Sequence, residues 1–196
     1  MRFETLLKLA AGLSSLTPES TIILFGSCSA FATFPDLADE ISTYENTNDA
    51  DFVPEPWTPE LAALLALEWG EDSAFSVQHG YFADINRPVI YENFPPGFRD
   101  RLVPLPGCSK VFALEPHDMA IAKIFAGRPK DILLLSILLA RGKLSEATLR
   151  TRLWFMPMDD KLFVKTHHVL RDVVAAAREL GYAVVCPETP WTAKAT

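Results

Sequence analysis

The sequence predicts an α+β fold, because the expected strands come first along the chain and the expected helices follow. Short apolar runs separated by turn residues fill residues 21–114, whereas apolar residues at helical spacing dominate from Pro116 onward. The 196 residues are 49% hydrophobic and 22% charged, the balance of a globular rather than a disordered protein. We therefore expect a sheet-bearing core over residues 1–115 and a helical region over residues 116–196, packed together as one unit.

The expected strands are short and rich in β-branched or aromatic residues. They are Thr21–Phe25, Asp49–Val53, Phe75–Ile85 with a bend at Gly80, Leu102–Leu105, Val111–Leu114 and Tyr182–Cys186. Proline and glycine mark a loop from Pro88 to Gly97 and a turn at Pro106-Gly107.

Helix signals are clearest after residue 115. The expected helices there are Pro116–Phe125, Pro129–Leu139, Glu146–Trp154 and Lys161–Leu180. Earlier in the chain, Thr58 is a predicted N-cap with Pro59 at the first helical position, and this helix should end at Gly70. Shorter helices are predicted after Ser27 and near Leu37–Ile41.

The N-terminal segment predicts an amphipathic helix rather than a secretion signal. Glu4 and Lys8 interrupt its apolar run. Its apolar residues follow helical spacing at Phe3, Leu6, Leu7, Ala10 and Leu13. The longest apolar run, Ile132–Ala140, is shorter than the roughly 20 residues that a membrane span needs. We therefore expect no membrane span and no membrane partner.

Charge and cysteine usage narrow the class of protein further. The net charge is −7, and residues 1–72 carry two basic and thirteen acidic side chains, whereas the remainder is net basic. This division is typical of a metal–carboxylate site facing a polyanion-binding surface, and equally of solvated faces of unequal sign. Three distant cysteines form neither a disulfide framework nor a zinc site, which predicts a reducing, cytoplasmic location.

Asp49 and Asp51 are the first candidate site residues. Two positions apart on a strand, they project to the same side, while Ala50 and Phe52 face the core. Neighbouring carboxylates repel unless a cation lies between them, and Mg²⁺ takes one or two carboxylates and completes its shell with water and phosphate oxygens. The pair predicts a magnesium or manganese site, although an exposed edge strand would carry the same pattern.

Gly26-Ser27 is the second candidate, because a predicted strand runs into it and a predicted helix follows. Such a junction presents backbone N–H groups and a helix N-terminus to a phosphate, and Ser27 adds a hydroxyl donor. A plain tight turn would have the same sequence.

Taken together, these elements resemble a known signature. A hydrophobic strand ending in Gly-Ser, a helix, and Asp-x-Asp on the next strand are similar to the nucleotidyltransferase (polymerase β-like) superfamily. The later segment LEPHDMAIAKIFAGRPKD, residues 114–131, resembles the LxPxDLAxxKLxAxRxKD segment of its bacterial AbiEii-like and DUF6036-type branch. The resemblance covers roughly residues 22–139 and implies a mixed sheet with flanking helices, followed by a helical region.

The resemblance implies roles for the residues on the strand side. Gly26 and Ser27 would hold the triphosphate of a nucleoside triphosphate (NTP), and Asp49 and Asp51 would ligate magnesium. Asp84 would supply a third carboxylate, either as a metal ligand or as the base for an acceptor hydroxyl.

The resemblance also implies roles on the helical side. Lys123 would contact the nucleotide phosphates, and Arg128 and Lys130 are candidate phosphate contacts. Asp131 would orient or support the catalytic side of the helix pair. A solvent-exposed lysine and a favourable helix N-terminal charge are the ordinary alternatives for Lys123 and Asp131. We expect His117, at a helix start, to be a cap or a surface residue.

Two departures from the pattern bear on activity. Twenty-one residues separate Ser27 from Asp49, so Phe34–Asn48 resembles an insertion, and Ile132–Leu135 replaces a second acid that toxin-type members carry. The leading hypothesis is a magnesium-dependent nucleotidyltransferase acting on an RNA (tRNA included), protein or small-molecule hydroxyl. It would be the toxin of a toxin–antitoxin pair if a cognate antitoxin exists. The alternative is a catalytically degenerate member that binds nucleotide or a partner.

Overall fold

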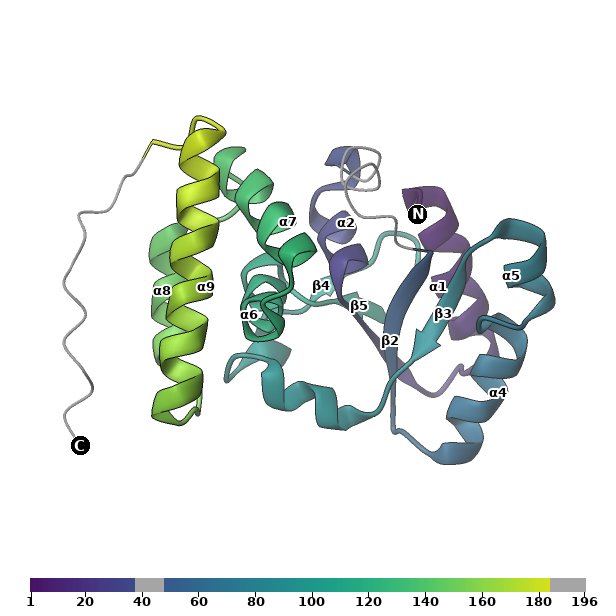
Figure 1. Ribbon diagram of the computed structural model, residues 1–196. Helices are drawn as coiled ribbons and strands as arrows, with labels where there is room; N and C mark the ends of the chain where they lie inside the picture. Colours follow the sequence, from purple (N-terminus) through teal and green to yellow (C-terminus); the bar gives the residue numbers. More distant parts are fainter. Residues whose placement is uncertain (38–47, 184–196) are drawn as a thin grey trace.

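A five-stranded mixed sheet forms the centre of the first half of the chain (Figure 1). The computed structural model describes residues 1–37 and 48–183. The strands are β1 (Thr21–Phe25), β2 (Asp49–Glu55), β3 (Phe82–Ile85), β4 (Val103–Pro104) and β5 (Val111–Ala113). They lie in the order β3-β2-β1-β5-β4.

The sheet combines both pairing directions. Strand β1 is antiparallel to β2 and parallel to β5, whereas β2 is parallel to β3 and β4 is antiparallel to β5. A mixed sheet flanked by helices confirms the predicted α+β fold class. The β1 residues Ile22, Ile23 and Leu24 are fully buried at its centre, as expected for an apolar strand covered on both faces.

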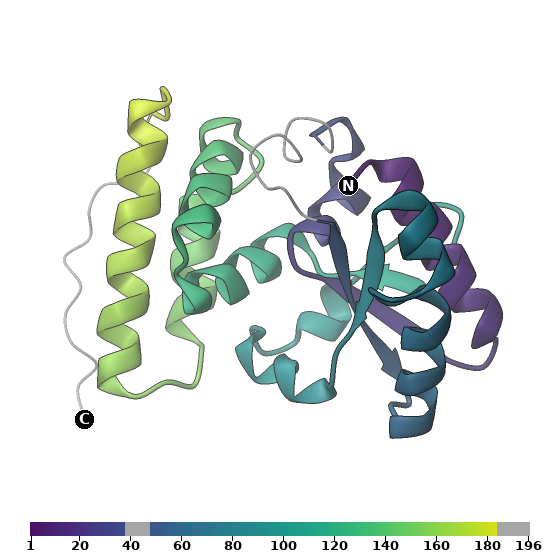
Figure 2. The same ribbon diagram turned by 45° about the vertical axis from the view of Figure 1, so that its right-hand side comes forward.

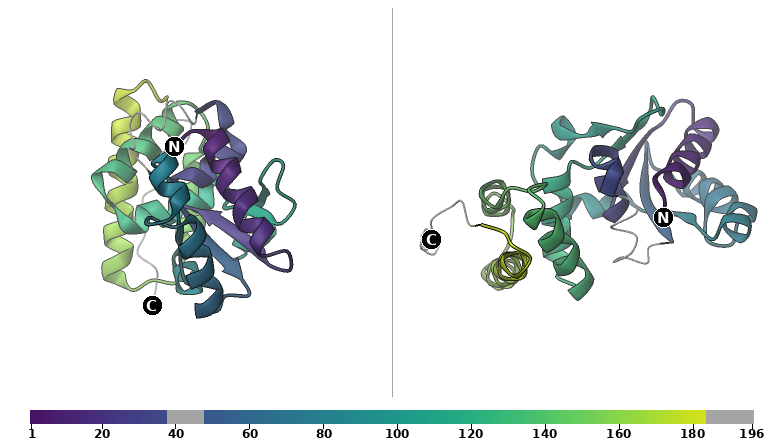
Figure 3. Two further views of the ribbon diagram at one scale, coloured as in Figure 1. Left: turned by 90° about the vertical axis from the view of Figure 1, so that its right-hand side faces the viewer. Right: turned by 90° about the horizontal axis from the view of Figure 1, so that it is seen from above.

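Helices lie on both sides of the sheet (Figures 2 and 3). Helices α1 (Phe3–Leu16) and α4 (Pro59–Trp69) pack together on one side, with α5 (Ala74–His79) beyond them near β3. The other side carries η1 (Ser27–Ser29), the short α2 (Ala30–Thr33) and α6 (Pro116–Ala126). A further 3₁₀ turn, η2 (Pro35–Leu37), follows α2.

The helical region continues from α6 with α7 (Pro129–Ala140), α8 (Glu146–Trp154) and α9 (Asp160–Glu179). Each observed boundary lies within one residue of its prediction. Helix α9 packs along α7, and α8 packs on α6 (Figure 2). In the described part of the chain, no helix combines the length and the apolar character that crossing a membrane requires. The division into residues 1–115 and 116–196 stays a prediction.

Capping residues account for the two helices between β2 and β3. Helix α4 starts as predicted, with Thr58 accepting a 3.1 Å hydrogen bond from the Leu61 N–H. The predicted strand over Phe75–Ile85 is wrong for its first half, which is α5. Ser73 Oγ accepts a hydrogen bond from the Ser76 N–H at 3.1 Å, and Gly80 ends the helix in the left-handed conformation. Only Phe82–Ile85 is strand.

Other predictions differ in part or lie outside the described residues. The predicted loop after Pro88 contains the 3₁₀ segments η3 (Pro88–Asn93) and η4 (Phe98–Arg101). Most of the predicted helix near Leu37–Ile41 and most of the predicted strand Tyr182–Cys186 lie outside the described residues, and Tyr182 and Ala183 form no regular element.

Candidate active site

Three aspartates from two neighbouring strands lie together on one face of the sheet. Asp49 and Asp51 occupy alternate positions on β2, and the parallel register sets Asp84 of β3 directly beside Asp51. One carboxylate oxygen from each residue lies within 4.8 Å of the other two. The sheet thus brings together Asp49 and Asp51, to which the resemblance assigns metal binding, and Asp84, to which it assigns metal binding or the role of base.

This cluster fits a divalent cation. Mg²⁺ holds oxygen ligands at about 2.1 Å, so two ligands of one ion lie at most about 4.2 Å apart, a spacing that small side-chain rotations would reach from 4.8 Å. Burial, reinforced by the negative charges of Asp49 and Asp84, raises the pKa of Asp51 from 3.8 to about 7. A bound cation would relieve this repulsion.

Gly26 brings the end of β1 up against Asp51. Its φ of +66° lies in the left-handed region that favours glycine, and a Cβ at this position would lie 2.1 Å from Asp51 Oδ2. The Gly26 carbonyl accepts a 2.8 Å hydrogen bond from Ser29 Oγ, and the largely buried Ser27 opens η1. Only glycine lets the turn approach the carboxylate this closely.

A cavity of about 550 Å³ lies against this turn. Gly26, Ser27, Asp49 and Asp51 line one side of it, and Lys123 of α6 lines another. Its volume is typical of small-molecule sites. Asp84 instead lines a neighbouring groove along β3 and α4, so the three carboxylates stand between two concave surfaces.

Lys123 and Asp131 form a buried ion pair between α6 and α7. Lys123 Nζ donates to Asp131 Oδ1 at 2.8 Å, and Arg128 Nε donates to Asp131 Oδ2 at 2.6 Å. Lys123 is only 5% exposed and Asp131 is fully buried. Burial by itself would raise the pKa of Asp131, but the hydrogen bonds and charges of Arg128 and Lys123 hold it below its usual value. Asp131 is therefore ionised and fixes both cations.

The cationic side chains face the same cavity as the acids. The exposed Arg128 and Lys130 line it together with Lys123. The charges of Lys123 and Arg128 also oppose the upward shift of the Asp51 pKa, which means that they lie within electrostatic reach of that carboxylate. The three residues that the resemblance makes candidate phosphate contacts thus line the same cavity as Asp49 and Asp51.

Sequence reasoning did not single out the remaining polar residues of the cavity. Asn86, just after β3, and Asn93, at the end of η3, line it with the apolar Ile90, Phe94 and Leu162. Asn86 Nδ2 donates to the Asp84 carbonyl at 3.2 Å. No sequence motif identifies these two asparagines as site residues, because the residues around them show only the pattern of a loop.

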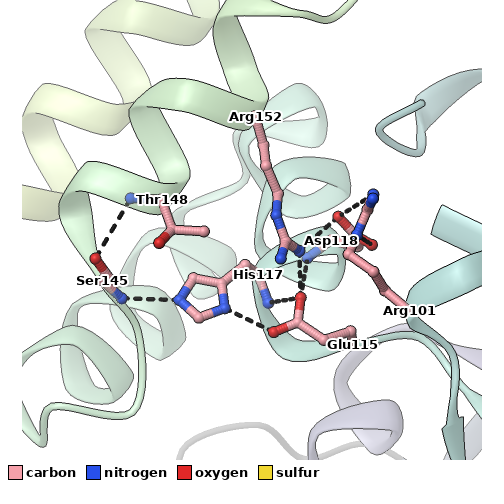
Figure 4. A network of polar contacts seen from close by, with 7 residues as sticks. All are labelled: Arg101, Glu115, His117, Asp118, Ser145, Thr148 and Arg152. Carbon is pink, nitrogen blue, oxygen red and sulfur yellow. Dashed lines mark hydrogen bonds and ion pairs between the residues drawn. The ribbon is translucent and has the colours of Figure 1, made fainter. Parts of the chain in front are cut away.

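A largely buried polar network joins η4 and α8 to the start of α6 (Figure 4). Asp118 is fully buried and accepts hydrogen bonds from Arg101 Nε at 2.9 Å and from Arg152 Nη1 at 2.6 Å. These two arginines come from η4 and α8. Asp118 lies in the segment that resembles the family, but the resemblance implies no role for it. An acid among apolar residues in a first helical turn was the available signal.

Glu115 and His117 extend this network (Figure 4). Glu115 caps α6 by accepting from the His117 and Asp118 N–H groups and also binds Arg152. Burial opposes its charge, but hydrogen bonds from His117 and Arg152 lower the pKa of Glu115 to about 2. His117 Nδ1 lies 2.7 Å from Glu115 Oε1, and His117 Nε2 accepts a 2.9 Å hydrogen bond from the Ser145 N–H. His117 is therefore not the predicted cap or surface residue, since it bridges the starts of α6 and α8.

The comparisons with known proteins agree with this geometry. A family model described as a nucleotidyltransferase of unknown function (DUF6036) matches residues 2–153, well over half of the chain. Neither the curated proteins nor the solved structures gave a match. The matched range contains the aspartate cluster, the Gly26 turn and the Lys123–Asp131 pair, whereas α9 lies beyond it. The chain therefore belongs to the nucleotidyltransferase family of unknown function, DUF6036.

Proposed function

We propose that this protein transfers a nucleotide from an NTP to a hydroxyl group, with Mg²⁺ or Mn²⁺ held by Asp49 and Asp51 and with Asp84 as the base. The observation that carries the proposal is the aspartate cluster itself, which adjoins a glycine turn and a cavity bordered by cationic side chains. Membership of a nucleotidyltransferase family supports the class of reaction.

The triphosphate would lie between the turn and the helices. The backbone at Gly26 and the hydroxyl of Ser27 offer hydrogen bonds, and Lys123, Arg128 and Lys130 offer positive charge on the opposite wall. Because Asp131 holds Lys123 in place, its ammonium group needs no reorganisation to meet a phosphate. Nucleotidyl transfer depends mainly on such positioning and charge neutralisation.

The three carboxylates would have two roles, cation binding and proton transfer. When bound, the cation supplies charge neutralisation at the phosphoryl oxygens. Asp49 and Asp51, which face the cavity, would hold it there. Asp84 is exposed and faces the neighbouring groove, so it would accept the proton of the acceptor hydroxyl. The acceptor oxygen then bonds to the α-phosphorus while the bond to the leaving pyrophosphate breaks.

The acceptor would be an RNA end such as that of tRNA, a protein hydroxyl or a small alcohol, and a growth-inhibiting toxin with a cognate antitoxin is one biological setting. Incubation with each radiolabelled NTP, total cellular RNA and total protein tests this. We expect a labelled adduct that requires Mg²⁺ or Mn²⁺ and disappears in the Asp49→Asn/Asp51→Asn variant. Equal labelling by the variant would overturn the assignment.

One observation favours a nucleotide-binding member without catalysis. The segment after Asp131, where toxin-type members carry a second acid, packs Leu134 and Leu135 into the helical core. If this difference removes activity, NTP and cation binding would persist without any adduct. The labelling experiment, paired with a binding titration, separates the two functions.

A further inference from the structure

The walls of the active-site cavity differ in chemical character. Its charged lining side chains come from β2, from α6 and from the start of α7; they are Asp49, Asp51, Lys123, Arg128 and Lys130. The lining side chains contributed by the segment after β3 and by the start of α9 are uncharged. In the proposed function the charged walls hold the cation and the triphosphate, which leaves the uncharged wall for another part of the nucleotide.

The uncharged wall combines apolar surface with two amides. Ile90 of η3 and Leu162 of α9 are its partly exposed apolar residues. Asn86 and Asn93 supply its polar side chains. Asn86, Ile90 and Asn93 also border a second hollow, of about 450 Å³, so they stand at the rim of the cavity. A nucleobase has apolar faces and polar atoms along its edges, and it therefore suits apolar surface with amides at the rim.

The two asparagines differ in how their amides are engaged. Asn86 Nδ2 donates to the Asp84 carbonyl at 3.2 Å, and since a carbonyl only accepts, this contact fixes the orientation of the Asn86 amide. The Asn93 side chain lines the cavity and makes no hydrogen bond to any residue that the structure describes. Both the donor and the acceptor of Asn93 are therefore available to a ligand.

We propose that the uncharged wall binds the base of the NTP, and that this base is adenine, recognised by the amide of Asn93. The inference rests on the proposed function, because it assigns the base to the space beside the triphosphate. An asparagine amide presents a donor next to an acceptor, and this pair matches the N6 amino group and the neighbouring ring nitrogen of adenine. Contact of the ring with Ile90 and Leu162 adds affinity by burying apolar surface.

An amide at this position suits adenine better than the other bases. The Watson–Crick edge of guanine presents two adjacent donors, which one carboxylate can accept together, whereas an amide accepts only one of them. The acids among the residues that line the cavity are Asp49 and Asp51, both on β2 and both assigned to the cation. Glu92 of η3 lines the second hollow instead. The smaller pyrimidines would bury less apolar surface on the same wall and so bind more weakly.

Calorimetric titration of the full chain with Mn²⁺ and the α,β-methylene analogues of the four NTPs tests this assignment. We expect the ATP analogue to bind at least about tenfold more tightly than the GTP analogue. Asn93→Asp should reverse that order, because a carboxylate accepts from both guanine donors, and Asn93→Ala should bring the two affinities within about threefold of each other. Gln78→Glu is the matched amide-to-acid control, since Gln78 is exposed on α5, and it should leave the order unchanged. Circular dichroism checks that each variant folds.

Inorganic tripolyphosphate separates this inference from the proposed function. With Mn²⁺ it should bind the wild type and Asn93→Ala equally, because it occupies only the charged walls. In NMR spectra of the wild type, the Asn93 side-chain amide should shift with the ATP analogue and stay unchanged with tripolyphosphate. A GTP, CTP or UTP analogue that binds as tightly as the ATP analogue, or a preference that Asn93→Asp leaves unchanged, would overturn the inference while triphosphate binding stands. If neither tripolyphosphate nor any analogue binds, the proposed function fails as well.

Discussion

The Lys123 ammonium donates a 2.8 Å hydrogen bond to the Asp131 carboxylate, which joins a buried cation on α6 to a buried anion on α7 at the wall of the cavity. Neither charge would be tolerated at this depth alone, since removing one member of a buried pair leaves the other uncompensated. The pair therefore links the stability of the helical region to the shape of the candidate site.

Replacing Asp131 by Asn should lower the free energy of unfolding by about 3–5 kcal/mol, because the buried Lys123 would lose the charged carboxylate that accepts its 2.8 Å hydrogen bond. Urea denaturation measures this loss. Asp160→Asn is the matched control, since Asp160 is also an acid in a first helical turn but is exposed. If both variants lose the same stability, the burial argument fails and only a helix N-terminal charge remains.

Cation binding should strengthen as the pH rises through neutrality. Burial and the neighbouring acids raise the pKa of Asp51 to about 7, so a proton competes with the cation below that value. At pH 6 only about a tenth of Asp51 is ionised, which predicts roughly tenfold weaker Mn²⁺ binding than at pH 8. Titration by electron paramagnetic resonance at both pH values measures the ratio. In Asp51→Asn this pH dependence should vanish, and an unchanged dependence would assign the titration to another group.

Gly26→Ala should abolish Mn²⁺ binding, since the new Cβ would lie 2.1 Å from Asp51 Oδ2. Gly80→Ala is the control, because Gly80 has a similar positive φ and its Cβ would meet nothing within 4 Å. Gly26→Ala carries the larger backbone strain, because Gly26 has ψ −163° whereas Gly80 is in the left-handed helical region with ψ 14°, so Mn²⁺ affinity is compared on the folded fraction of each variant. Equal affinities would mean that the turn does not position Asp51.

The sequence carries enough information where local signals decide the structure. Thr58 and Pro59 fix the start of α4, and Gly127 ends α6 in the left-handed conformation, so these boundaries are readable from a few neighbouring residues. The strand predicted where α5 lies was wrong because Phe75 and Val77 suit a strand as well as a helix. There the Ser73 cap and the glycine at position 80 decide the outcome.

The sequence could predict the components of the candidate site but only part of its geometry. Spacing alone sets Asp49 and Asp51 on one face of β2. The proximity of Asp84 depends on the parallel register of β2 and β3, which α4 and α5 separate along the chain. The role of Asp118 depends on contacts with Arg101 and Arg152, which lie 17 and 34 residues away along the chain. A local sequence pattern does not predict such contacts.

The network around Asp118 predicts a second stability effect. Arg152→Met leaves the buried Asp118 with Arg101 alone and removes a charged partner of Glu115, so the free energy of unfolding should fall by about 2–4 kcal/mol. Arg171→Met is the control, because its side chain is 72% exposed. A loss no larger than that of the control would contradict the network's role.

Arg152→Met should also change how the free energy of unfolding depends on pH in the acid range. With a pKa lowered to about 2, Glu115 contributes stability that is complete above its ordinary pKa of 4.5 and is lost as the pH falls from 4.5 toward 2. Without Arg152 this loss should begin nearer pH 4.5. Thermal unfolding across that range, compared with wild type, measures the displacement.

Asp84→Asn should separate binding from transfer, if the proposed reaction is correct. Asp49, Asp51 and Lys123 remain to hold cation and triphosphate, whereas the exposed carboxylate that would take the acceptor proton is gone. We expect transfer to fall by about 10²–10⁴-fold, the usual contribution of a general base, with NTP affinity changed by less than about threefold. Glu92→Gln, a neighbouring exposed acid on η3, is the control and should leave both quantities unchanged. A parallel loss of Mn²⁺ affinity would instead make Asp84 a metal ligand, and unchanged transfer would remove it from the site.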